Sequence, residues 1–324
     1  MKKVIPLKIL GINISHNMSY CVIENGKIKS FLNEERLNKQ KHFCPTLKTF
    51  NNIKGLDLFK NIEFDVVALT SWINKSEEEL SKLILDKLKY RRYTFDRKNH
   101  HKYHAIAALH HSSLNEAMVL IRDGGGAPYS TEYFNYRETD TIWKVDKNKI
   151  DFVYGHYSDA RTRLAEARLD QAARSWFGLA AKTVKTESTN KEINKDNSLL
   201  TSRVVGGLKY AHFSWKAGFG TEYGHFMGLA PYAQVSKKYD NIDYKAVELA
   251  HKAQIETFDE TCELIDNSEL SNSKNIILSG GYFLNCLNNF KLVKKYPNIN
   301  FFVDPIPHDA GTSLGVAVHT ANYT

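Results

Sequence analysis

Residues 8–32 read KILGINISHNMSYCVIENGKIKSFL, and they predict three short strands that follow one another along the chain. The first apolar run, residues 8–13, ends at a polar turn over residues 15–19. Asn25-Gly26 separates the next two runs, and an Asn-Gly pair between strand-forming runs is a strong signal for a two-residue hairpin turn. The chain therefore begins with an antiparallel three-stranded meander.

Helices and strands alternate after this meander. Residues 64–70 predict a buried strand, residues 76–90 predict an amphipathic helix, and a histidine cluster at residue 100 opens a further helix that runs to about residue 114. This order of elements is typical of an α/β protein.

The second half of the chain repeats the same order. It begins with a predicted strand over 116–122 that ends at Asp123-Gly124-Gly125-Gly126, followed by strands over 130–137 and 139–145 with Glu138-Thr139-Asp140 in the turn. Further along, a predicted strand over 275–278 stops at Ser279-Gly280-Gly281. A helix, a strand over 299–303 and a final helix from about Asp309 complete the half. Two such halves resemble the duplicated lobes of the actin-like ATPase fold, which is RNase H-like and holds a nucleotide between its lobes. We expect a first lobe over residues 1–115 and a second over residues 116–324.

A basic segment at about residues 159–205 interrupts the second half. Apolar residues between Leu169 and Ala180 fall at helical spacing, and arginines and lysines lie among them. The pattern fits a surface helix whose apolar stripe packs on the core, or a basic helix that contacts a phosphate backbone.

The composition is that of an ordinary globular protein, with 42% hydrophobic and 25% charged residues in 324. No apolar run reaches the roughly 18 to 20 residues of a membrane span, and the N-terminus lacks the pattern of a signal peptide. The four cysteines include no CxxC pair. We therefore expect a cytoplasmic protein without membrane contact. The net charge of +8 suits a polyanionic partner such as nucleic acid, or simply solubility.

His100 and His104 carry the main chemical signal. They are four residues apart, so on a helix they project from the same face. With Asp309 they form a set of two imidazoles and one carboxylate, which leaves positions on a metal open to substrate. The alternative is a polar helix face in contact with solvent.

Several ordered motifs carry a resemblance to a known family. They are ILGI at 9–12 with HNMS at 16–19, NEER at 33–36, HHKYHA at 100–105 leading to Asp123-Gly124, MGLAPY at 227–232, SGGYFLNC at 279–286 with Asn289, and residues 305–315. Together they resemble the transferase domain of the O-carbamoyltransferases, which include antibiotic-tailoring and nodulation-factor enzymes. The tRNA threonylcarbamoyl transferases share the fold and the two-histidine motif, but the runs at 227–232 and 279–286 favour the O-carbamoyltransferases.

The resemblance implies a reaction and a site. Such enzymes use carbamoyl phosphate and ATP to form carbamoyl adenylate, and then pass the carbamoyl group to a hydroxyl. By resemblance, His100, His104 and Asp309 hold iron or another divalent metal, so His104 is also counted as catalytic. The residues expected to contact nucleotide or phosphate are Gly124, Gly125, Gly280, Gly281 and Asn285. His16 is either the general base for the acceptor hydroxyl or a histidine that caps the turn.

The chain departs from the family in two places. Gly224-His225-Phe226 stands where the family usually has a lysine, and the chain stops at Thr324, after the transferase domain. Either a separate adenylate-forming domain supplies the intermediate, or this domain performs both steps. A homodimer is a further expectation.

Short relatives of this kind are associated with phages that modify their DNA. The expected acceptor is therefore the hydroxymethyl group of 5-hydroxymethylcytosine in DNA, reached in the host cytoplasm, with Trp215 or Tyr223 stacking on a displaced base. The alternatives are a small sugar or antibiotic hydroxyl, or a non-catalytic nucleotide-binding subunit.

Overall fold

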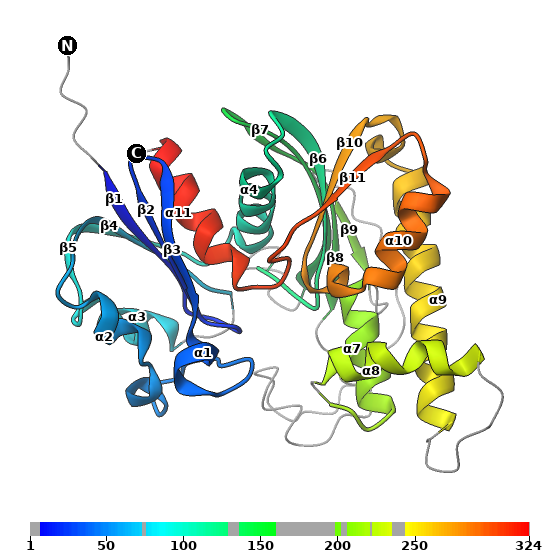
Figure 1. Ribbon diagram of the computed structural model, residues 1–324, viewed down its shortest axis with the longest axis horizontal. Coiled ribbons are helices and arrows are strands. Elements are labelled where there is room, and N and C mark those ends of the chain that lie inside the picture. The colour runs from blue at the N-terminus through cyan, green and yellow to red at the C-terminus, as the bar shows by residue number, and fades with distance from the viewer. Residues whose placement is uncertain are drawn as a thin grey trace.

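The computed structural model describes residues 7–72, 76–128, 136–159, 198–201, 206–220, 222–234 and 244–323. Two mixed β-sheets stand side by side, each with helices on its outer face, and two further helices lie between them (Figure 1). The predicted two-lobe α/β architecture is confirmed. No helix in the described ranges is long and apolar enough to span a bilayer.

The first sheet has the strand order β3-β2-β1-β4-β5. Its strands are β1 (Lys8–Asn13), β2 (Ser19–Glu24), β3 (Lys27–Asn33), β4 (Glu63–Thr70) and β5 (Lys89–Asp96). β1, β2 and β3 form the predicted antiparallel meander, while β4 and β5 run parallel to β1. Its outer face is covered by α1 (Glu34–Asn38), η1 (Phe50–Asn52), α2 (Gly55–Phe59) and α3 (Glu77–Leu85).

The second sheet repeats this order as β11-β10-β6-β7-β8, with β9 added at its edge. The strands are β6 (Glu116–Arg122), β7 (Tyr136–Asp146), β8 (Ile150–Asp159), β9 (Ser198–Thr201), β10 (Asn275–Ser279) and β11 (Asn300–Val303). β6, β7 and β8 are antiparallel, and β10 and β11 run parallel to β6. The shared order of five strands shows that the two lobes are duplicates in topology.

Helices of the second half cover the outer face of this sheet (Figure 1). They are α7 (Gly207–Lys216), α8 (Tyr223–Leu229), η2 (Ala230–Gln234), α9 (Tyr244–Asp266), η3 (Glu269–Asn272), η4 (Gly281–Leu284) and α10 (Cys286–Lys295). Their apolar faces join Leu120, Ile142, Ile276 and Leu278 in one core.

Two sequence-based predictions were wrong in their bounds. The helix expected over residues 76–90 ends at Leu85, and β5 begins at Lys89. β5 is an edge strand that is mostly exposed, so it lacks the apolar alternation that identifies half-buried strands. Residues 138–140 lie inside β7 rather than in a turn, because this stretch pairs with β6 on one side and β8 on the other.

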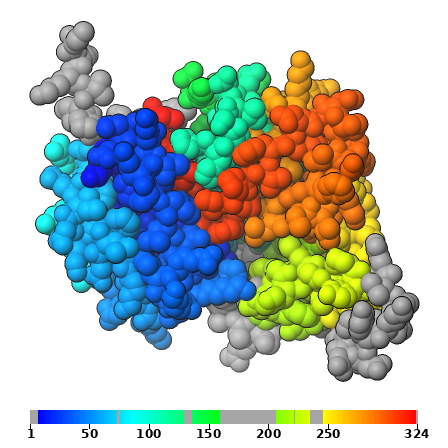
Figure 2. Space-filling model, in the orientation of Figure 1, coloured from blue at the N-terminus to red at the C-terminus, as the bar shows by residue number. Residues whose placement is uncertain are grey.

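The helices α4 (His100–Ser112) and α11 (Gly311–Tyr323) pack against each other between the sheets (Figure 1). Tyr103 and Ile106 of α4 join Ile9 of β1 and Ala317 of α11 in one apolar cluster. Ala105 and Ala108 face the second sheet. In Figure 2 the orange-red segment that leads into α11 fills the space between the lobes.

The proposed boundary at residue 115 stays a prediction. α11 is the last element of the chain, yet it packs on β1, β2 and β4 of the first sheet. Glycine permits this close approach, since a Cβ on Gly11 would overlap the carbonyl oxygen of Ser313 and one on Gly315 would overlap that of Tyr103.

Gly315→Ala should therefore destabilise the protein by at least about 2 kcal/mol, because the backbone of α4 cannot move aside without opening the core. Gly228 in α8 is a matched control, since a Cβ there meets nothing within 4 Å. Gly228→Ala should be neutral or stabilising by up to about 1 kcal/mol, as expected for a helix. Chemical denaturation of both variants measures the difference. Equal free energies of unfolding would contradict the packing argument.

Candidate metal centre

The first turn of α4 supplies two buried imidazoles. His100 and His104 are 1% and 0% exposed, and their Nε2 atoms lie 3.2 Å apart. One helical turn separates the two residues, so both rings project from the same face of α4. The prediction of a solvated polar face is excluded for this pair, because the helix begins between the two sheets.

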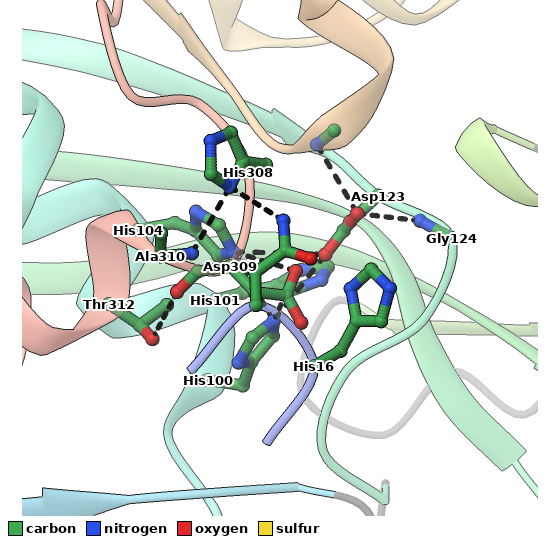
Figure 3. A network of polar contacts seen from close by, with 12 residues as sticks. His16, His100, His101, His104, Asp123, Gly124, His308, Asp309, Ala310 and Thr312 are labelled. Atoms are coloured by element: carbon green, nitrogen blue, oxygen red, sulfur yellow. Dashed lines mark hydrogen bonds and ion pairs between the residues drawn. The ribbon is translucent and has the colours of Figure 1, made fainter. Parts of the chain in front are cut away.

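Two carboxylates meet these imidazoles. Asp309, just before α11, has its Oδ1 3.7 Å from Nε2 of His100 and 3.9 Å from that of His104. Asp123, just after β6, has its Oδ2 3.4 Å and 3.7 Å from the same two atoms. One ligand atom from each of the four residues lies within 4.8 Å of all the others (Figure 3).

Asp123 was missed as a ligand by the sequence analysis, which treated it as part of a glycine loop. One signal was present: Asp123 directly follows β6, whose middle residues are all apolar, and precedes three glycines. In parallel α/β sheets, ligands collect at such strand ends.

Each carboxylate is oriented by donors on its far side. Oδ1 of Asp123 accepts hydrogen bonds from the backbone N–H groups of Gly124 at 2.7 Å and Gly281 at 3.2 Å. Oδ2 of Asp309 accepts one from Nε1 of Trp72 at 3.0 Å. The other oxygen of each carboxylate is left facing the histidines, as expected when outer groups orient metal ligands.

The spacing of the four groups fits a single cation. Ligands about 2.1 Å from a metal lie roughly 3.0 to 3.4 Å apart at octahedral or tetrahedral angles. The pairs that include a histidine are 3.2 to 3.9 Å apart, and all four ligand atoms lie within 4.8 Å of one another. Two imidazoles with two carboxylates suit a divalent transition metal such as iron or zinc rather than calcium.

The charges at this centre are strongly perturbed. Burial and the neighbouring Asp123 raise the pKa of Asp309 to about 7. Burial by itself would raise the pKa of Asp123 too, but the hydrogen bond with His100 and the charge of His104 hold it well below its usual range. Burial and His100 lower the pKa of His104 to about 3, so this imidazole is neutral and able to coordinate a metal near pH 7.

The four predicted glycines gather around Asp123. A Cβ on Gly124 would meet nothing within 4 Å, so there is open space in front of its backbone. Gly125 is buried. Gly280 has φ +95, and a Cβ there would overlap the backbone of Arg122, so this position requires glycine. Gly281 supplies the N–H that orients Asp123.

Asn285 lies away from this group. Its side chain caps α10 by accepting from the N–H of Asn288, and it donates to Tyr210 at 2.8 Å and to Gln254 at 2.9 Å. It is 4% exposed. The structure therefore uses this amide inside the second lobe, and its predicted nucleotide contact stays a prediction.

His16 lies beside the cluster (Figure 3). Its ring stacks on that of His42, with centroids 5.3 Å apart. Burial and His42 lower the pKa of His16 to about 3. A general base works best when its pKa lies near the working pH, so His16 in this arrangement is a weak base.

The expected DNA-contacting residues are only partly described. Trp215 in α7 and Tyr223 at the start of α8 are both half-buried. The predicted basic helix within residues 161–185 lies outside the described residues.

Comparison with known proteins gives two sequence relatives, and no protein-family model matches the chain. Over 95% of its length the chain is 23% identical to nodulation protein NolNO of Sinorhizobium fredii, and it covers 46% of that protein. It is 24% identical to the uncharacterized protein sll1178 of Synechocystis over 68% of its length, and it covers 35% of that protein. The chain thus spans less than half the length of either relative.

A solved structure shares the fold. Full-length HypF in its phosphate- and nucleotide-bound form superposes with a TM-score of 0.54 at 15% identity, covering 99% of this chain and 56% of that one.

Replacing one ligand tests the metal centre. His104→Ala should remove tightly bound Fe²⁺ or Zn²⁺, lowering the affinity by more than about 100-fold, because the three remaining groups lose an imidazole that nothing can replace. His110→Ala is the matched control, since His110 is exposed on the same helix. Metal content by mass spectrometry and affinity by calorimetry give the readout. Equal metal content in the two variants would refute the site.

Metal affinity should also depend on pH with a definite sign. Without metal, Asp309 is partly protonated at pH 7 because its pKa is raised to about 7, and a bound cation must displace that proton. Below pH 7, deprotonation of Asp309 should therefore raise the metal affinity by up to about tenfold per pH unit. Above pH 7 this carboxyl is already ionised, so it should add no further dependence on pH. Titrations at pH 6, 7 and 8 check this. Asp309→Asn should bind metal more weakly and show a shallower slope.

Proposed function

We propose that the protein transfers a carbamoyl group to a hydroxyl at the centre formed by His100, His104, Asp123 and Asp309. The observation that carries the proposal is the convergence of these four buried side chains between two lobes, next to the open space in front of Gly124. The similarity to a nodulation protein supports the class of reaction.

The four ligands fit a divalent metal, which would supply Lewis-acid stabilisation of the charge that develops on the carbamoyl group or a phosphate. Trp72, Gly124 and Gly281 keep the two carboxylates directed at one point, so little rearrangement is needed when charge develops. α4 and α11 shield the histidines from water, which strengthens each of these electrostatic contacts.

The hydroxyl oxygen attacks the carbamoyl carbon of carbamoyl adenylate, and the bond from that carbon to the phosphate oxygen breaks. AMP leaves, and the hydroxyl proton passes to a base of the protein. Carbamoyl adenylate forms from carbamoyl phosphate and ATP. It is made either at this site or by a separate adenylate-forming protein.

The nucleotide is proposed to lie against Gly124 and Gly125. The open space at Gly124 lets a phosphate approach the backbone closely, as glycine loops permit. The HypF structure that shares this fold was solved with phosphate and nucleotide, which supports a nucleotide in this architecture.

The proposed acceptor is the hydroxymethyl group of 5-hydroxymethylcytosine in DNA. The net charge of +8 is compatible with a polyanionic substrate such as DNA. A small sugar or antibiotic hydroxyl is the second candidate, and it is consistent with the similarity to a nodulation protein.

Mass spectrometry of nucleosides tests the reaction directly. DNA that contains 5-hydroxymethylcytosine, incubated with the protein, ATP, carbamoyl phosphate and Fe²⁺, should gain one carbamoyl group on the modified base. His104→Ala should give no product, and His110→Ala should match the wild type.

Other outcomes separate the alternatives. Conversion of ATP to AMP without modified DNA would reject the DNA acceptor and favour a small-molecule hydroxyl. Transfer only when synthetic carbamoyl adenylate is added would show that a separate protein makes the intermediate. A protein that binds nucleotide but neither metal nor carbamoyl group would be a non-catalytic subunit.

A further inference from the structure

Two residues with a left-handed backbone meet beside the metal centre. Asn17 has φ 57 and His42 has φ 56, and Nδ1 of His42 lies 3.1 Å from Oδ1 of Asn17. Such a backbone is uncommon for residues other than glycine and costs on the order of 1 kcal/mol or more at each position. Asn25 in the hairpin turn and Lys39 and Ser113 at helix C-caps share this backbone conformation. Asn17 and His42 differ from them because their side chains contact each other beside the candidate metal centre.

One backbone N–H group determines which ring nitrogen of His308 carries the proton. The N–H of Ala310 points at Nδ1 of His308 at 3.3 Å, so this ring nitrogen must accept a hydrogen bond. Nδ2 of Asn17 lies 2.9 Å from the same nitrogen and donates to it as well. A neutral imidazole carries one proton, so His308 has its proton on Nε2.

The orientation of the Asn17 amide then determines which ring nitrogen of His42 carries the proton. Because Nδ2 of Asn17 faces His308, its Oδ1 must face His42. An amide oxygen only accepts hydrogen bonds, so Nδ1 of His42 carries the proton and Nε2 presents a lone pair. A single asparagine thus holds one histidine as a donor and another as an acceptor.

Both histidines border the proposed reaction site. His308 directly precedes the ligand Asp309, and His42 stacks on His16, which lies beside Asp123 (Figure 3). Lys41, next to His42, forms a 2.7 Å ion pair with Glu222, which directly precedes α8. His42 therefore lies where the two lobes meet, and it is only half-buried, so a substrate can reach it.

We propose that His42, rather than His16, accepts the proton of the attacking hydroxyl, and that Asn17, whose amide is oriented by His308, positions it. This inference rests on the proposed carbamoyl transfer. The proton moves from the hydroxyl to Nε2 of His42 as the bond to the carbamoyl carbon forms, and the Asn17 oxygen stabilises the resulting imidazolium through Nδ1–H, as a buried carboxylate does in hydrolase triads.

The electrostatic surroundings favour His42 over His16 as the base. Burial and Lys41 lower the pKa of His42, while Glu35 and Glu222 oppose this effect. Burial and the adjacent His42 lower the pKa of His16 to about 3.

Nitrogen-15 NMR of the histidine side chains tests the tautomers without any assay of activity. His42 should show a protonated Nδ1 and a bare Nε2, whereas His308 should show the reverse. The signals are assigned by their loss in His42→Asn and His308→Gln, and asparagine is chosen because it tolerates the left-handed backbone. A protonated Nε2 on His42 would overturn the proposal.

Kinetic measurements test whether His42 is the general base. His42→Asn should lower kcat for carbamoyl transfer by about 100-fold or more and remove the acidic limb of the pH profile, with metal content unchanged. Asn17→Ala should lower kcat and shift that limb, while His225→Ala, which alters an exposed histidine beside Glu222, should match the wild type.

The failures of this proposal and of the proposed function are distinguishable. Loss of transfer in His16→Asn with full activity in His42→Asn would reject His42 as the base but keep the reaction. Absence of transfer to every hydroxyl by the wild-type protein would reject the reaction and the base together, whatever tautomers NMR reports.

Discussion

Two imidazoles and two carboxylates share a space where no ligand atom is more than 4.8 Å from another, and all four side chains are buried. Charges removed from water are costly unless other groups compensate them. Here part of the compensation comes from within the cluster, through His100 and His104, and part from Trp72, Gly124 and Gly281 outside it. Each of these donors satisfies one carboxylate oxygen, so the other is available to a cation.

The duplicated topology explains how the four ligands meet. β1 and β6 hold equivalent places in the two sheets, and α4 and α11 follow the last strand of each set of five. His100 begins α4, Asp309 precedes α11, and Asp123 follows β6. Equivalent ends of two related lobes therefore face one another, and the site requires both lobes.

Close packing between the lobes excludes water from the site and holds its residues in fixed positions. Gly11 and Gly315 let α11 approach β1 and α4 so closely that no side chain fits between them. Cores with this packing deform little, so the histidines and the start of α11 are held as one unit. Next to this unit, the contacts of Asn17 with His42 and His308 fix the orientation of both imidazole rings.

The sequence by itself determined the features that depend on local period and turn chemistry. Alternating runs and Asn25-Gly26 predicted the meander, and a spacing of four placed His100 and His104 on one helical face. Asp123 as a ligand, β5 as an edge strand and the place of α11 against the first sheet depended on the tertiary structure. Each of these depends on partners far away in the chain, and local periodicity carries no information about such pairings. The protonation of His42 and His308 depends on a backbone N–H and an amide that only the folded chain brings together.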